Sequence, residues 1–207
     1  MRLILVRHGQ SEGNATGVIQ GHLDFGLTEL GLRQAEATAE RLAREGVERI
    51  LTSPLLRASA TAQILAAKCG LEIEPEPGLS EYGIGEVAGL TGAEVAQRHP
   101  EIAAAYRKGV RPVFPGEEGR ERFYERIRAV FERWKASGQT TAAITHGGVI
   151  SALCYDVLGL DHRRPGIFQV ANCSMTIITL DRMGRPVILR HNDTCHLDGI
   201  VTVEDPG

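Results

Sequence analysis

Apolar and polar positions alternate along the first part of the chain in a pattern of strands and helices. Residues 3–6 form a short, wholly apolar run, which predicts a strand covered on both faces, and Arg49–Thr52 predicts a second strand. Between them a helix is predicted from Thr28, its N-cap, to Glu45. The apolar face of this helix carries Leu32, Ala35, Ala39 and Leu42.

The same pattern continues to the C-terminal side. Ser53 as N-cap and Pro54 in the first helical position predict a helix that ends near Gly70. Residues 72–89, rich in glycine and proline, are predicted to be mostly loop with a short strand. Helices are predicted at residues 91–98, 102–108, 120–137 and 146–158, and strands at residues 141–145, 173–180 and 187–191, the last two joined by a turn at residues 181–184.

Strands that alternate with helices predict an α/β fold. We expect a single domain with a mostly parallel central sheet flanked by helices on both faces, and the length of 207 residues fits one such domain.

Composition narrows the function classes. The formal net charge of -3 gives no general attraction to nucleic acid or to an anionic membrane. The apolar run at residues 3–6 is too short for a signal peptide or a membrane span, and the four cysteines contain no Cys-x-x-Cys pair. We therefore expect a cytoplasmic protein with free thiols and no nucleic-acid or membrane partner, while the sequence leaves monomer and homodimer open.

Polar clusters follow three of the predicted strands. They are Arg7-His8, Ser53 with Arg57, and His146-Gly147. Ligands of open α/β sheets bind at the carboxyl ends of the strands, so if these strands are neighbours, two histidines and two arginines meet in one crevice.

Such a crevice suits a phosphoryl group. Guanidinium forks match its oxygens, and a neutral imidazole is a competent nucleophile toward phosphorus. Arg57 falls in the first turn of a helix whose free backbone N–H groups could face the same anion. Each cluster alone is more often structural or solvated, and it is their combination at matching strand ends that favours function.

Several motifs, in order along nearly the whole chain, resemble those of the histidine phosphatase superfamily, in its phosphoglycerate-mutase-like branch. They are Arg7-His8-Gly9-Gln10-Ser11-x-x-Asn14, Ser53-Pro54-Leu55-x-Arg57, Leu79-x-Glu81, Pro115-Gly116-x-Glu118 and Thr145-His146-Gly147-Gly148. Val87 and Ala88 stand where that family commonly has Trp and Glu, which puts the substrate specificity in doubt but not the chemistry.

The resemblance implies a role for each matching residue. His8 would become phosphorylated, Arg7, Arg57 and His146 would hold the phosphoryl oxygens, and Glu81 would act as acid and base, with Glu86 as its competitor. The remaining binding residues would be Ser11, Asn14, Gln20, Gly21 and Gly147. Residues 1–207 would form one histidine-phosphatase-like domain in which about residues 82–140 cap the substrate.

The predicted function is that of a phosphomonoesterase that acts on a small phosphorylated metabolite without a metal or another cofactor. Two alternatives remain open: a cofactor-dependent phosphoglycerate mutase and a non-catalytic sensor of a phosphorylated ligand. The sequence between Glu81 and His146 contains no paired-arginine segment of the kind seen in such mutases, which favours the phosphatase. The potential metal ligands His191, Asp193, Cys195 and His196 match no standard zinc spacing, so no metal site is expected there.

Overall fold

A six-stranded sheet forms the centre of the computed structural model, which describes residues 1–162 and 166–200. The strands lie in the order β3-β2-β4-β1-β5-β6. Their bounds are β1 (Arg2–Arg7), β2 (Arg49–Thr52), β3 (Ile73–Pro75), β4 (Thr141–Thr145), β5 (Met175–Leu180) and β6 (Pro186–Asp193). The first four are parallel, whereas β5 and β6 run antiparallel to their neighbours, so the predicted mostly parallel α/β fold is confirmed.

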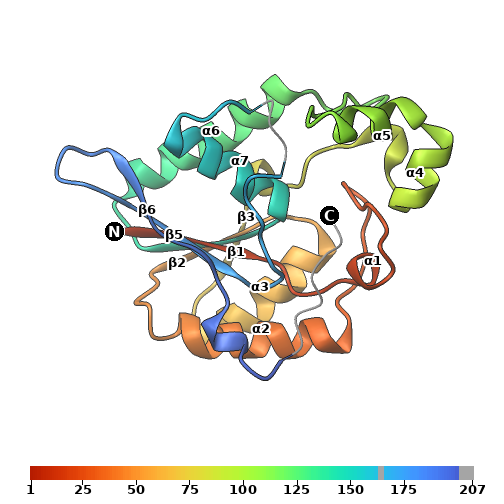
Figure 1. Cartoon of the computed structure of the whole chain (residues 1–207). Coiled ribbons are helices and arrows are strands. Elements are labelled where there is room, and N and C mark those ends of the chain that lie inside the picture. The colour runs from red at the N-terminus through yellow and green to blue at the C-terminus, as the bar shows by residue number, and fades with distance from the viewer. Residues whose placement is uncertain (163–165, 201–207) are drawn as a thin grey trace.

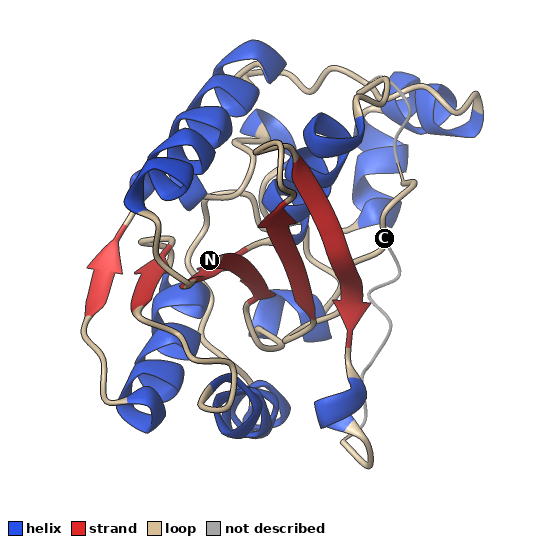
Figure 2. Cartoon of the chain, turned by 90° about the vertical axis from the view of Figure 1, so that its left-hand side faces the viewer, coloured by secondary structure: helices blue, strands red, loops and turns tan. Residues whose placement is uncertain are grey.

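Helices cover both faces of the sheet (Figures 1 and 2). Their bounds are α1 (Glu12–Ala15), α2 (Glu29–Leu42), α3 (Leu56–Cys69), α4 (Gly92–Arg98), α5 (Pro100–Arg107), α6 (Arg120–Ser137) and α7 (Gly147–Leu158), with short 3-10 turns η1 (Pro77–Leu79), η2 (Gly85–Val87) and η3 (Cys195–Leu197). In the part of the chain that the structure describes, no helix has the length and apolarity needed to cross a membrane.

Alternating side chains of β1 divide the core into two layers. Leu3 and Leu5 belong to the cluster that contains the buried faces of α6 and α7, whereas Ile4 and Val6 pack with α2 and α3. All four are at most 3% exposed, as expected of a strand that is covered on both sides.

Helix α2 begins where the sequence predicts but differs on its inner face. Thr28 Oγ1 accepts from Gly31 N at 3.0 Å as the N-cap. Leu32, predicted to be on the apolar face, is 43% exposed, and Gln34 is buried instead. Gln34 Oε1 accepts a hydrogen bond from Gln10 N at 2.9 Å, so this face supports the loop after β1 as well as the core.

The start of α3 corrects a second prediction. The helix begins at Leu56, with Leu55 as its N-cap, and not at Ser53 and Pro54. Ser53 Oγ lies 2.7 Å from His146 Nε2, and Asp24 Oδ1 accepts from Leu56 N at 2.9 Å. Long-range partners thus replace the local cap that the sequence suggests.

Two smaller differences concern the segments next to β1 and β5. Ser11 and Asn14 form a capping box that starts the four-residue helix α1, where no helix was predicted. Strand β5 begins at Met175 instead of residue 173, because Cys173 has a φ of 57°, a left-handed conformation that a strand cannot contain.

Candidate active site

Three neighbouring strands deliver the predicted catalytic side chains to one edge of the sheet. His8 follows β1, Ser53 follows β2, and His146 follows β4, which lies between the other two. His8 N donates to Thr145 O at 2.9 Å and Ser53 N donates to Ile144 O at 2.9 Å, so both segments are bound to β4. The two imidazole rings lie with their centroids 5.1 Å apart, which establishes the adjacency that the sequence only assumed.

The imidazole of His8 is buried and held in one orientation. Its Nδ1 lies 2.7 Å from Gly9 O, and since a carbonyl only accepts, Nδ1 carries the proton. Nε2 is then unprotonated and accepts a hydrogen bond from Arg57 Nε at 3.2 Å. Burial, together with the charges of Arg7 and Arg57, lowers the pKa of His8 well below its usual value. His8 is therefore a neutral imidazole with its lone pair beside a guanidinium group.

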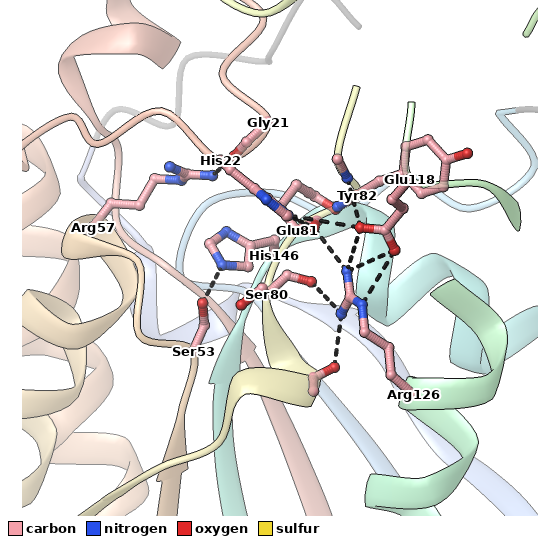
Figure 3. A network of polar contacts seen from close by, with 12 residues as sticks. Gly21, His22, Ser53, Arg57, Ser80, Glu81, Tyr82, Glu118, Arg126 and His146 are labelled. Carbon is pink, nitrogen blue, oxygen red and sulfur yellow. Dashed lines mark hydrogen bonds and ion pairs between the residues drawn. The ribbon is translucent and has the colours of Figure 1, made fainter. Parts of the chain in front are cut away.

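Arg57 is fixed by the loop that follows α1. The side chain is 1% exposed, and its terminal nitrogens donate to Leu23 O and Gly21 O, both at 2.8 Å. Figure 3 shows Arg57 next to Gly21. Free backbone N–H groups were expected at the start of α3. Instead, Leu55 N donates to Ser53 Oγ and Leu56 N donates to Asp24 Oδ1. Positive charge for a bound anion therefore comes here from the guanidinium of Arg57 and not from the amides of Leu55 and Leu56.

Arg7 is the last residue of β1 and directly precedes His8. It is 8% exposed, lines the cavity, and donates through Nη1 to Val170 O at 2.5 Å. Gly147 is close beside it: a Cβ at that position would lie 3.7 Å from Arg7 Nε. Gly147 therefore backs Arg7 and is not among the residues that line the cavity.

His146 is fully buried at the start of α7. Its Nε2 lies 2.7 Å from Ser53 Oγ, and its Nδ1 has no hydrogen-bonding partner among the described residues. Ser53 Oγ accepts from Leu55 N at 3.3 Å, and its hydroxyl proton can be donated to His146 Nε2, an arrangement in which the imidazole proton lies on Nδ1. Burial, then electrostatic coupling to the adjacent His8 imidazole, and then the charges of Arg57, Arg7 and Arg126 lower the pKa of His146 well below its usual value.

Glu81 reaches the same cavity from the segment between β3 and α4. Its Oε1 accepts from Tyr82 N at 2.8 Å, and its Oε2 accepts from Gly148 N at 3.1 Å. The carboxylate thus lies against the first turn of α7, where backbone amides favour negative charge. Glu86, the competing carboxylate, is exposed in η2 and does not line the cavity.

A polar network holds the backbone that presents Glu81 (Figure 3). Arg126, on α6, donates to Gly78 O, Ser80 O and Glu81 O at 2.6–2.8 Å. The same guanidinium pairs with Glu118, whose Oε2 also accepts from Gly83 N at 2.9 Å. This ion pair binds both ends of the segment that carries Glu81.

The predicted binding residues divide into two groups. Asn14, Gln20 and Gly21 line the cavity, whereas Ser11 is completely buried behind it. Ser11 Oγ accepts from Asn14 N at 3.2 Å and lies 2.8 Å from Gln20 Oε1, so it connects the two amides instead of facing a ligand.

Several residues at the site were not predicted to be part of it. Asn172 Nδ2 donates to His8 O at 3.0 Å and to Asn14 Oδ1 at 3.2 Å, and Gly148 contacts Glu81. His22 Nε2 lies 2.6 Å from Glu81 O. The sequence signal for Gly148 was its place in the motif Thr145-His146-Gly147-Gly148.

The four potential metal ligands near the C-terminus do not converge. His191 Nε2 lies 2.9 Å from Gln169 O, whereas His196 Nε2 lies 3.0 Å from Cys173 O. Asp193 accepts a hydrogen bond from Cys195 N and pairs with arginines. Within residues 1–162 and 166–200, no group of three or more His, Cys, Asp or Glu side chains could hold a metal ion.

The cavity has a volume of about 390 Å³. Arg7, His8, Arg57 and Glu81 lie at its polar end, and the rest of its wall comes from Asn14, residues 17–21, Tyr82, Ile84, Gly92 and Gly148. This combination of one polar end and an uncharged wall is common in sites for small molecules.

Comparisons with known proteins identify relatives along nearly the whole chain. The family model described as histidine phosphatase superfamily (branch 1) matches residues 3–194. Phosphoglycerate mutase-like protein 4 of Arabidopsis thaliana is 34% identical over 205 residues, covering 95% of this chain and 86% of that protein. Phosphoserine phosphatase 1 of Hydrogenobacter thermophilus is also 34% identical, covering 95% of this chain and 94% of that protein.

A solved structure agrees with the fold. The mycobacterial glucosyl-3-phosphoglycerate phosphatase in complex with VO3 superposes with a TM-score of 0.85 at 30% identity, covering 93% of this chain and 99% of that chain.

Proposed function

Because the chain belongs to the histidine phosphatase superfamily, we propose that it is a metal-independent phosphomonoesterase that works through a phosphohistidine on His8. The observation that carries this proposal is the unprotonated Nε2 of His8, buried and in contact with the guanidinium of Arg57. An imidazole that stays neutral below its ordinary pKa is ready to attack phosphorus at neutral pH.

In the first step, His8 Nε2 forms a bond to phosphorus while the bond to the ester oxygen breaks. For this step Glu81 must enter in its protonated form; it passes that proton to the departing oxygen, which releases an alcohol and leaves Glu81 as a carboxylate. In the second step, Glu81 takes a proton from water, the hydroxyl adds to phosphorus, and the N–P bond breaks to give inorganic phosphate. At the end of the cycle the proton is again on Glu81 and the lone pair is again on His8 Nε2.

The surrounding groups stabilise the charge on the transferred phosphoryl group. Arg7 and Arg57 supply two guanidinium groups, and His146, protonated at Nδ1 when Ser53 donates to its Nε2, would supply a buried N–H whose nitrogen has no partner among the described residues. Such fixed donors need no rearrangement during the reaction, which supports catalysis by positioning and electrostatics. Residues 82–140 would cap the substrate, and Tyr82 and Ile84 already belong to the cavity wall.

The test is to trap the intermediate. The protein is mixed with a ³²P-labelled phosphomonoester in the presence of a chelator and quenched in alkali, in which a phosphoramidate survives. We expect label that is lost in acid, steady release of phosphate, and neither signal in His8→Asn. Label that persists in His8→Asn, or activity abolished by the chelator, would refute the mechanism.

The same preparation separates a phosphatase from a mutase. With 3-phosphoglycerate, with or without a bisphosphorylated primer, we expect phosphate release to exceed formation of the isomer. Faster isomer formation would favour the mutase, and binding of phosphate esters without turnover would favour a sensor.

A further inference from the structure

The outer part of the cavity is built from two segments that are distant in sequence. Apart from the phosphate-binding end, Gly148 and the uncharged residues Asn14, Gln20 and Gly21, its wall is formed by Gly17, Val18, Ile19, Tyr82, Ile84 and Gly92. Ile19 N donates to Leu90 O and Gly89 N donates to Ile19 O, both at 2.9 Å, and Val18 forms a bridge with Thr91. Backbone hydrogen bonds therefore join residues 17–21 to residues 82–92 into one continuous wall.

The side chains of this wall are packed in place. The ring of Tyr82 meets Phe123 edge-on with centroids 4.9 Å apart, and the guanidinium of Arg111 lies 4.5 Å from the Tyr82 ring centroid. Ile84 packs directly on Gly21, where a Cβ would come within 2.5 Å of Ile84 Cγ1 and the φ is +50°. The wall is a fixed apolar surface whose shape depends on a glycine at position 21.

The wall offers no cation to a second anionic group. Among the described lining residues, the only cations are Arg7 and Arg57, and both are directed to the phosphoryl end. The neighbouring Arg111 pairs with Glu117 at 3.1 Å, and Arg126 pairs with Glu118 at 3.1 Å. A carboxylate on the substrate would lose its water against apolar side chains and would approach Glu81.

We infer that this wall is a subsite for an uncharged organic group with an apolar face, so that the preferred substrates are monophosphates of neutral phenols and carbon-rich alcohols. This inference rests on the proposed phosphomonoesterase activity and specifies its substrate class. A volume of about 390 Å³ is near the lower limit for small-molecule sites, about 300–1,000 Å³, so the organic group is small.

The test compares two esters that differ by one charge. Phenyl phosphate and 4-carboxyphenyl phosphate share the ring and the ester, and the carboxylate makes the phenol a slightly better leaving group. We nevertheless expect kcat/KM to be about 10- to 100-fold lower for the carboxylate, the order set by an unpaired buried polar group.

A charge introduced into the wall should reverse this preference. Val18 is half-buried in the wall, and Val18→Lys places an ammonium group where the carboxylate would lie. We expect it to raise kcat/KM for 4-carboxyphenyl phosphate about tenfold relative to phenyl phosphate, whereas Val18→Gln, of similar length but neutral, should not.

The outcomes separate this inference from the function on which it rests. Equal hydrolysis of both esters, a preference for the carboxylate, or the same shift in Val18→Gln as in Val18→Lys would overturn the neutral subsite and leave the phosphatase standing. Hydrolysis of neither ester, with no label on His8, would overturn the proposed function and this inference with it.

Discussion

Replacing Gly148 by alanine would place a methyl group against the carboxylate of Glu81. A Cβ at this position would lie 2.3 Å from Glu81 Oε1 and 3.0 Å from its Cδ, whereas ordinary contacts begin at 3.4 Å. The carboxylate must therefore retreat by about 1 Å, and a misplacement of this size can lower a rate about 100-fold. We expect kcat/KM for an alkyl phosphate to fall by about that factor.

The fold should tolerate this change. Gly148 is the second residue of α7 and its φ lies outside the left-handed region, so alanine fits the backbone and gains up to about 1 kcal/mol of helix propensity. The atom that must move is the end of a flexible side chain. The free energy of unfolding, measured with urea, should stay within about 1 kcal/mol of the wild-type value.

Two measurements show whether the loss passes through Glu81. Esters with a good leaving group, such as 4-nitrophenyl phosphate, need little protonation, so their kcat/KM should fall much less than that of an alkyl phosphate. In Glu81→Gln, which should itself lose about 10²–10⁴-fold, adding Gly148→Ala should cost less than about threefold more. An unchanged rate with the alkyl ester, or losses that multiply in the double variant, would refute the reasoning.

Three further predictions follow from the neighbouring contacts. Ser53→Ala removes the hydroxyl 2.7 Å from His146 Nε2 and should lower kcat/KM about tenfold, the equivalent of one hydrogen bond, and a loss below twofold in steady-state assays would argue against this role. Arg126→Met leaves Glu118 unpaired and should lower the free energy of unfolding by about 1.5–3 kcal/mol in urea, so an unchanged unfolding midpoint would contradict it. Because the folded-state pKa values of His8 and His146 are depressed, the unfolded chain takes up protons below about pH 6.5 that the folded chain does not, so stability present above that pH should decline toward pH 5. Urea unfolding should show a smaller decline in His8→Asn, and an equal decline would be inconsistent with a depressed His8 pKa.

The sequence predicts the site well where it depends on strands and on the edge at which they end. Buried strands are short apolar runs, so β1, β2 and β4 can be located directly, and the residues that follow them must share an edge once the strands are neighbours. The sequence could therefore predict that His8, Arg57 and His146 meet on the assumption that these strands are neighbours, and the strand order supplies that adjacency.

The incorrect predictions for the start of α3 and the inner face of α2 share one physical cause. Polar side chains there form hydrogen bonds with residues that are distant in sequence. Ser53 has the local signature of a helix cap, but it contacts His146, and Asp24 takes over the amide of Leu56. Gln34 is buried because it binds the backbone of Gln10, and Leu32 is displaced to the surface. No rule that considers neighbours along the chain can anticipate such contacts.

The ion pair that supports Glu81 could not be predicted for the same reason. Arg126 and Glu118 lie about forty residues from Glu81 and look like ordinary polar residues on an amphipathic helix and in a loop. Their role appears only when α6 is packed against the segment that they bind.

The hydrogen bonds that attach His8 and Ser53 to β4 also bear on how such a protein can diversify. The reactive imidazole is mounted on the interior of the sheet, whereas residues 17–21 and 82–92 are held to one another mainly by main-chain contacts. Substitutions in those two segments can alter which ester is admitted while the spacing of the reacting groups stays constant. Related proteins can thus differ in substrate specificity while they keep the same catalytic residues.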